Sequence, residues 1–286
     1  MKTRVSPLES IATHLALVLG VAFTLYPILW VVSRAFSGSR PPSAAVVPLV
    51  HDATLAHLET VVGHSKKIGE QTVWLFGQQL FNSLAVSLAT AAVGVFIAVP
   101  AAYALARFRF VGKEGGVRAL LATQMFPTVA SLIPLYIILN TLGLLNSLTG
   151  LVACYATTAV PFAIFQLRAA FEAIPVDLEE AAMVDGATRF QAFLRVALPA
   201  ARPAIAVTAL FAFMSAYNEF ILAATLLSKE ELFTLPVALQ SYIGEYDAKW
   251  DLFAAGALVV SIPVMALFYL AQRHLVAGLT AGGVKG

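Results

Sequence analysis

The sequence has 286 residues, of which 59% are hydrophobic and only 12% are charged. A soluble domain carries about 25% charged residues, so this composition indicates a protein whose main solvent is lipid. The formal net charge is only +2 and no run of Lys or Arg is present, which excludes a basic surface for nucleic acid. The single cysteine, Cys154, excludes an intrachain disulfide and a multi-cysteine zinc site.

Six segments are apolar over enough residues to cross a bilayer, which takes about 20 residues in a helix. The first has basic residues before it, but its apolar run is too long for a signal peptide and no small-residue cleavage site follows. We therefore expect a retained membrane helix there. Prolines in the second, third and sixth spans are expected to kink those helices, at Pro100, Pro127, Pro134 and Pro263. In chain order the predicted spans are 11–33, 80–106, 118–141, 147–168, 200–227 and 252–274.

The distribution of basic residues predicts the orientation. With six spans both termini lie on one side of the membrane, and placing them in the cytoplasm puts twelve of the 18 Lys and Arg side chains inside. Short inner loops carry most of this excess, as the positive-inside rule requires. We therefore predict a multi-pass protein of a bacterial inner (cytoplasmic) membrane with both termini in the cytoplasm.

A polar segment, Glu179–Pro199, interrupts this apolar sequence between the fourth and fifth spans. Pro175 and the acidic residues that follow it are typical of a helix start, and Gly186 is a natural stop. Thr188 with Gln191 fits a capping box that opens a second helix, with Phe190, Phe193 and Leu194 on its apolar side. The two-helix loop could rest on the lipid surface, or it could be gripped by a cytoplasmic partner.

The spacing of this segment resembles the EAA loop of the permease subunits of bacterial ABC importers. The matching residues are Glu180-Ala181-Ala182, Gly186, Val196 and Leu198-Pro199, with Val196 where the family often has Ile. The sequence Asp185-Gly186-Ala187 resembles the carbohydrate-importing branch. Gln124-Met125-Phe126-Pro127 and the glycine-rich ending, residues 278–286, are similar to the MalG family of maltose and maltodextrin importers.

The resemblance implies an all-α integral membrane protein with six transmembrane helices and a cytoplasmic coupling-helix loop, the type I ABC importer permease fold. It divides the chain into an N-terminal helix and external loop (1–79), a core permease domain (80–275, with its EAA loop at 172–199) and a cytoplasmic tail (276–286). The loop residues implied to couple to an ATPase are Glu179, Glu180, Ala181, Ala182, Asp185 and Gly186. The tail residues implied to contact it are Gly282, Gly283 and Lys285.

The implied partners are a second permease subunit of the MalF type, an ATPase dimer of the MalK type, an extracytoplasmic sugar-binding protein and membrane lipids. No nucleic acid is expected. The chain has no G-x-x-x-x-G-K-[ST], H-E-x-x-H or G-x-S-x-G sequence, so we expect it to be non-catalytic. ATP and Mg would be bound by the partner ATPase, and no cofactor or metal by this chain.

Polar residues within the spans are candidates for a translocation path or a subunit interface. A carboxylate near the bilayer centre costs about 2.5–3.5 kcal/mol on insertion scales, so Glu219 should face a cavity or a partner, unless it hydrogen-bonds near the membrane surface. The full group of candidates comprises Gln124, Asn140, Tyr217, Asn218 and Glu219.

The predicted function is the channel-forming permease subunit of an ATP-driven importer, which couples ATPase motion to alternating access. By resemblance, its substrate is maltose, maltodextrin or a related oligosaccharide, with trehalose among the alternatives. An ion-driven secondary sugar transporter, working without an ATPase, is the other hypothesis. The scarcity of acidic residues within the spans argues against it.

Overall fold

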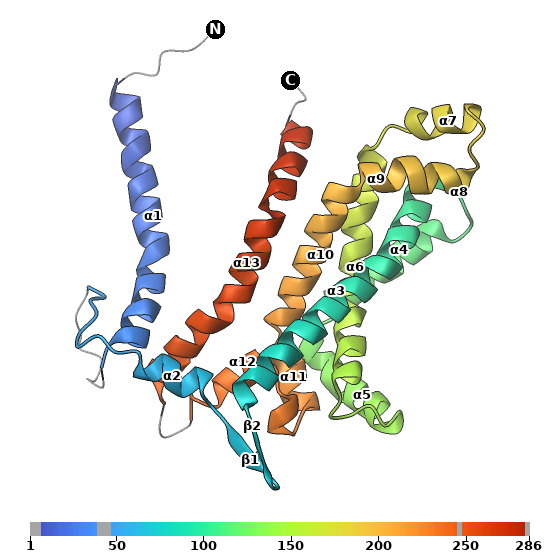
Figure 1. Ribbon diagram of the computed structural model, residues 1–286. Coiled ribbons are helices and arrows are strands. Elements are labelled where there is room, and N and C mark those ends of the chain that lie inside the picture. The colour runs from blue at the N-terminus through green and yellow to red at the C-terminus, as the bar shows by residue number, and fades with distance from the viewer. Residues whose placement is uncertain (1–6, 39–46, 245–247, 284–286) are drawn as a thin grey trace. The chain divides into compact units, whose positions relative to one another are not determined.

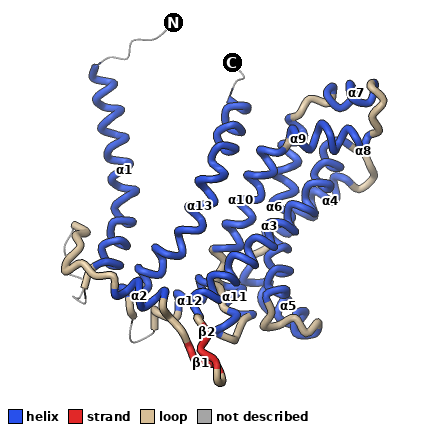
Figure 2. The backbone as a smooth tube through the Cα atoms, viewed as in Figure 1, coloured by secondary structure: helices blue, strands red, loops and turns tan. Residues whose placement is uncertain are grey.

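The structure is a computed structural model that describes residues 7–38, 47–244 and 248–283. Figures 1 and 2 show that the described chain is almost entirely helical, with one short two-stranded hairpin. The strands β1 (Lys66–Ile68) and β2 (Gln71–Val73) pair antiparallel. The long helices are α1 (Pro7–Phe36), α3 (Leu75–Arg107), α6 (Leu148–Ala173) and α13 (Trp250–Gly283). The shorter ones are α2 (Ala56–Val62), α4 (Lys113–Met125), α5 (Thr128–Thr141), α7 (Asp177–Val184), α8 (Arg189–Ala192), α9 (Leu198–Ala200), α10 (Arg202–Tyr217), α11 (Ile221–Leu226) and α12 (Leu235–Gln240).

The four long helices are each apolar over a length that can cross a membrane. Two bent helix pairs, α4 with α5 and α8–α9 with α10, raise the number of candidate spans among the described residues to six. The predicted fold class, an all-α membrane protein with six spans, is therefore confirmed in its element content.

The third predicted span is not one continuous helix. Helices α4 and α5 meet at an angle of 102°. Pro127 has no N–H to donate and disfavours helical backbone at the residue before it, and Phe126 is accordingly extended, with ψ 127°. The kink predicted at Pro127 is thus confirmed. Helices α3, α5 and α13 continue through Pro100, Pro134 and Pro263, and the kinks expected there stay predictions.

The fifth predicted span, 200–227, also departs from a single helix. Its first part bends by 69° at Ala201, between α9 and α10. Helix α10 then ends at Tyr217, and the short helix α11 follows. The apolar composition of the whole segment concealed these breaks, because hydropathy alone does not report helix ends.

The chain forms two compact units. One holds the described residues up to Phe76 together with Leu239–Ile262, and the other holds Gly77–Ala238 with the described residues from Pro263 on. The domains predicted from sequence, with boundaries at 79/80 and 275/276, are defined by expected role and not by packing. That division stays a prediction.

Within the first unit, Arg34 of α1 forms an ion pair with Asp251 of α13. The Ser33 hydroxyl donates to the carbonyl oxygen of Leu49 at 2.7 Å. An added Cβ at Gly256 would be 2.2 Å from Leu239 Cδ2, so a larger residue there would require the Leu239 side chain to move.

The second unit contains the loop singled out in the sequence. Small residues let its elements approach closely, as is common between membrane helices. One buried cluster joins α3, α6 and the turns before α10, and consists of Ala98, Ala102, Ala163, Ile164, Leu167, Phe171, Ala197 and Ala201. Figure 1 shows α7 and α8 beyond the ends of α6 and α10.

Candidate functional site

The polar segment folds as the predicted pair of helices. Helix α7 ends at Val184, and Gly186 follows with φ +93°, a conformation that L side chains rarely adopt. The Ala187 N–H returns to the Ala182 carbonyl at 3.0 Å, as expected of a helix that ends at a left-handed glycine. The predicted stop at Gly186 is thus confirmed.

The predicted capping box at the start of α8 is also confirmed. The Gln191 N–H donates to Thr188 Oγ1 at 3.2 Å, and the Thr188 N–H donates to Gln191 Oε1 at 2.8 Å. These two bonds satisfy amide groups that a helix start leaves without partners. Beyond Ala192 the chain continues as a π-helical turn, Phe193–Ala197.

The apolar side expected for α8 is only partly used within the chain. Phe193 packs on the ring of Tyr103, with ring centroids 4.5 Å apart. Phe190 is 68% exposed, and Leu194 is exposed as well. The Phe190 and Phe193 rings lie 6.3 Å apart, so the predicted apolar side is present, with Phe193 packed on α3 and the other two side chains exposed.

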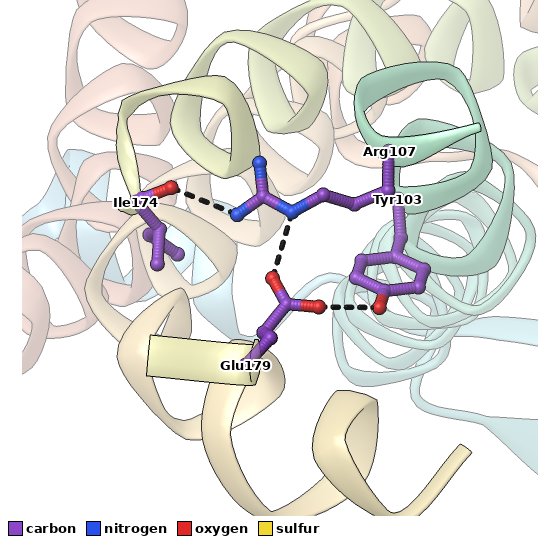
Figure 3. A network of polar contacts seen from close by, with 4 residues as sticks. All are labelled: Tyr103, Arg107, Ile174 and Glu179. Atoms are coloured by element: carbon purple, nitrogen blue, oxygen red, sulfur yellow. Dashed lines mark hydrogen bonds and ion pairs between the residues drawn. The ribbon is translucent and has the colours of Figure 1, made fainter. Parts of the chain in front are cut away.

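Glu179 holds α7 against the end of α3. Glu179 is 5% exposed, and its carboxylate contacts two side chains of α3, as Figure 3 shows. Tyr103 Oη donates to Glu179 Oε2 at 2.5 Å, and Arg107 Nε donates to Glu179 Oε1 at 2.7 Å. Arg107 Nη2 also donates to the carbonyl oxygen of Ile174 at 2.8 Å, at the end of α6. One arginine therefore ties three elements together.

Aromatic rings pack against the Tyr103 side of this network. The Tyr103 ring meets Phe171 of α6 edge-on at 5.5 Å and Phe108 at 5.9 Å. Such pairs are worth about 0.5–1.5 kcal/mol beyond the area they bury. Because the ion pair is buried, separating α7 from α3 would leave a charge without its partner.

The opposite side of α7 carries the remaining coupling candidates. Glu180, Ala181 and Asp185 are exposed, and Ala182 is half-buried. Within the part of the chain that the structure describes, no ion pair engages Glu180. Glu179, placed in the same group by sequence, has its carboxylate directed inward and unavailable to a partner.

Exposed apolar residues lie beside these acids. Val184 is 87% exposed, and Leu178 and Phe190 are exposed with it. We call the surface made by Leu178, Glu180, Ala181, Val184, Asp185 and Phe190 the α7 face. An apolar group rimmed by carboxylates is typical of a surface that meets another protein.

The candidates within the spans lie in different settings. Glu219 accepts the N–H groups of Leu222 at 2.9 Å and Ala223 at 3.2 Å, so it caps α11. Tyr217 is buried and stacks on Phe213, with centroids 5.4 Å apart. Asn218 Nδ2 donates to the Met214 carbonyl oxygen at 2.9 Å.

Gln124 and Asn140 are exposed. Gln124 Nε2 donates to the Thr158 carbonyl oxygen at 3.2 Å, and Gln124 lines a hollow described below. The structure does not bring Asn140 to that hollow. In the tail, Gly282 and Gly283 belong to the last turn of α13, and Lys285 lies outside the described residues.

Sequence reasoning missed Tyr103 and Arg107. Arg107 ends a span, where a basic residue is expected as an interface anchor, and Tyr103 suits the same boundary. Nothing in the sequence links either residue to a carboxylate more than 70 positions away. Two polar residues one helical turn apart at the end of an apolar helix are the only available signal.

These features define a class: a polytopic membrane protein with bent helices and an ordered two-helix loop presented outside the bundle. Residues 92–281 match the model of the family described as "Binding-protein-dependent transport system inner membrane component". The chain belongs to this family.

Curated relatives align over nearly the whole chain. It is 36% identical to the sulfoquinovosyl glycerol transport system permease protein SmoH of Agrobacterium fabrum, covering 98% of this chain and 94% of that one. It is 37% identical to the trehalose permease protein SugB of Mycobacterium tuberculosis, covering 93% and 94%. It is 35% identical to the maltose/maltodextrin permease protein MalG of Vibrio parahaemolyticus, covering 96% and 95%.

A solved structure agrees with these relatives. A chain of a bacterial ABC transporter that imports the acidic polysaccharide alginate superposes with a TM-score of 0.77 and 25% identity, covering 95% of this chain and 99% of that one. The fold is that of a type I ABC importer permease, and the resemblance seen in the EAA loop is confirmed. None of these relatives supports an ion-driven carrier.

Proposed function

We propose that this chain is the channel-forming permease subunit of an ATP-driven oligosaccharide importer, and that the α7 face receives the motion of a partner ATPase. The observation that carries the proposal is the two-sidedness of α7. One side is locked to α3 through Glu179, while the other presents Glu180, Val184 and Asp185 to the outside.

This arrangement suits the transfer of force. A partner that displaces α7 must also displace Arg107 and the end of α3, because separating them would strand a buried charge. Helix α3 runs from Leu75 to Arg107, which is long enough to span the membrane. A push on the loop therefore becomes movement of a transmembrane helix, rather than local bending of a flexible connection.

Alternating access follows if the ATPase holds the α7 face differently in its ATP-bound and ATP-free states. A partner with equal affinity for the two conformations of the permease would not shift the equilibrium between them. ATP and Mg would be bound and hydrolysed by that partner, while this chain contributes the path and the contact surface. We place the α7 face and both termini in the cytoplasm, on the distribution of basic residues.

The remaining partners follow from the same assignment. A second permease subunit of the MalF type would complete the path, and a sugar-binding protein would dock on outer segments within 35–79 and 228–251. The relatives named for trehalose, maltodextrin and sulfoquinovosyl glycerol support a glycoside substrate. The tail residues Gly282, Gly283 and Lys285 would extend the ATPase contact.

Co-purification tests the proposal. The tagged chain, expressed with its neighbouring genes, should retain a nucleotide-binding subunit in two copies, and binding protein with sugar should stimulate ATP hydrolysis. A chain that accumulates sugar alone in liposomes, driven by an ion gradient, would overturn it.

A further inference from the structure

A hollow opens between α4, α6 and α10, away from the α7 face. Its volume is about 270 Å³. The second unit contains all of its lining, which consists of Gln124, Thr158, Ala159, Phe162, Phe211, Ala212 and Ser215. The floor is made of small buried residues, Ala159 and Ala212, and the walls are polar or aromatic.

The polar walls need an explanation because they belong to apolar spans. Gln124, Thr158 and Ser215 are all exposed. The Thr158 hydroxyl donates to the Tyr155 carbonyl oxygen at 3.0 Å, which leaves its oxygen able to accept a further hydrogen bond. Exposed polar groups of this kind within a membrane span face water, a ligand or another subunit. Gln124 Nε2 is directed to the Thr158 carbonyl, which leaves Gln124 Oε1 able to accept a further hydrogen bond.

The aromatic walls add a second kind of contact. Phe162 and Phe211 are 47% and 45% exposed, and their rings meet edge-on with centroids 6.4 Å apart and an interplanar angle of 76°. Each ring face carries negative partial charge, which attracts weakly positive C–H groups. A pyranose ring offers such C–H groups on its faces and hydroxyls around its edge, so it matches both kinds of wall.

A second hollow adjoins the first. It measures about 550 Å³, shares Thr158 with the first, and is also lined by Thr123, Ser131 and Thr157. The Thr123 and Thr157 hydroxyls donate to the carbonyl oxygens of Leu120 and Cys154, so toward a ligand they can act as acceptors. Pockets for small molecules commonly measure about 300–1,000 Å³ and combine apolar walls with a few polar groups. Two adjoining hollows with hydroxyl groups suit a ligand of more than one sugar ring.

We propose that the hollow around Phe211 is a carbohydrate subsite on this subunit, where a pyranose ring stacks on an aromatic face and hydrogen-bonds to Gln124, Thr158 and Ser215. The adjoining hollow takes a neighbouring ring of the same oligosaccharide. This assignment rests on the proposed import function and adds a contact residue set to it. Gln124, in the last turn of α4, lines the first hollow, and Phe126, the residue that ends this helix, lines the second.

The test uses the complete importer, with both permeases, ATPase and binding protein, reconstituted in liposomes. Uptake of ¹⁴C-labelled trehalose and maltotetraose is measured for the wild type and for Phe211→Leu, Phe211→Tyr and Gln124→Leu. Leucine keeps an apolar side chain without a π face, whereas tyrosine keeps the face. Phe96→Leu is the matched control, because Phe96 is an exposed phenylalanine of α3 that lines neither hollow.

We expect Phe211→Leu and Gln124→Leu to lower the uptake rate at subsaturating sugar roughly fivefold to tenfold. Phe96→Leu should stay within about twofold of the wild type, and Phe211→Tyr should retain most of the uptake that Phe211→Leu loses. Stimulation of the ATPase by binding protein should persist in all variants, since the α7 face is unchanged.

Three results overturn the subsite. Wild-type uptake by Phe211→Leu and Gln124→Leu would show that no sugar contacts the hollow. An equal loss of uptake in Phe211→Leu and Phe211→Tyr would show that Phe211 serves packing and does not contact sugar. Loss of the second permease from the purified Phe211→Leu complex would assign the hollow to the subunit interface. Failure of the wild-type complex to take up either sugar would instead count against the proposed function.

Discussion

Arg107 and Glu179 are separated by 72 positions in the sequence, yet their side chains form a buried ion pair with Nε and Oε1 2.7 Å apart. The pair joins the end of a transmembrane helix to the helix that presents the α7 face. A buried pair is weak support for net stability, because desolvation of the charges offsets their attraction. Its value here is geometric: it fixes α7 to α3 in one arrangement.

Breaking this pair on one side should be more harmful than removing it entirely. Glu179→Leu leaves Arg107 buried without its carboxylate, which we expect to cost about 3–5 kcal/mol. The double variant Glu179→Leu/Arg107→Leu should recover much of that loss. The loss in the single variant and its recovery in the double variant are measured by thermal unfolding of the detergent-solubilised complex and by amide hydrogen exchange of residues 177–184. Strictly additive effects of the two substitutions would contradict the linkage.

Tyr103→Phe should have a smaller effect of the same kind. It removes one hydrogen bond to a carboxylate, worth about 1.5–3 kcal/mol, and keeps the ring contacts with Phe171 and Phe193. Faster hydrogen exchange in α7 is the expected sign. Tyr136→Phe, at an exposed tyrosine of α5, is the control and should leave α7 unchanged.

The two adjacent glutamates should respond differently to charge reversal. Glu180→Lys alters an exposed side chain, so the chain should fold normally but lose ATPase in co-purification. Glu179→Lys places a second cation beside Arg107 and should destabilise the permease itself. Glu114→Lys, which breaks only an exposed pair with Arg118, controls for surface charge. Equal ATPase retention by Glu180→Lys and Glu114→Lys would remove Glu180 from the contact.

Gly186→Ala should destabilise the loop although space is available. No atom lies within 4 Å of an added Cβ, so the penalty comes from the backbone, whose φ is +93°. A left-handed conformation costs an L residue about 1–2 kcal/mol. Asn tolerates this region better, so Gly186→Asn should lie between alanine and the wild type in thermal stability. Identical stability of all three would show that the turn relaxes freely.

The sequence predicted the local features of this protein well. Hydropathy located the spans, and the signals at Gly186, Thr188 and Gln191 located the ends of the loop helices, because each depends on neighbouring residues only. The break at Phe126 lies where Pro127 predicted a kink, whereas the helix end at Asn218 was concealed by apolar composition. The inward direction of Glu179 was also hidden, since two adjacent glutamates have the same local signal and only tertiary packing distinguishes them.

Photo-crosslinking from Val184 tests the central claim most directly. Val184→p-benzoylphenylalanine places a photoreactive group at a side chain that is 87% exposed on the α7 face. In the assembled importer we predict a covalent adduct with the ATPase subunit whose yield differs between ATP-bound and ATP-free states. The same group at Phe96 should give no such adduct. Adducts at Val184 with phospholipid alone, in both nucleotide states, would contradict the account.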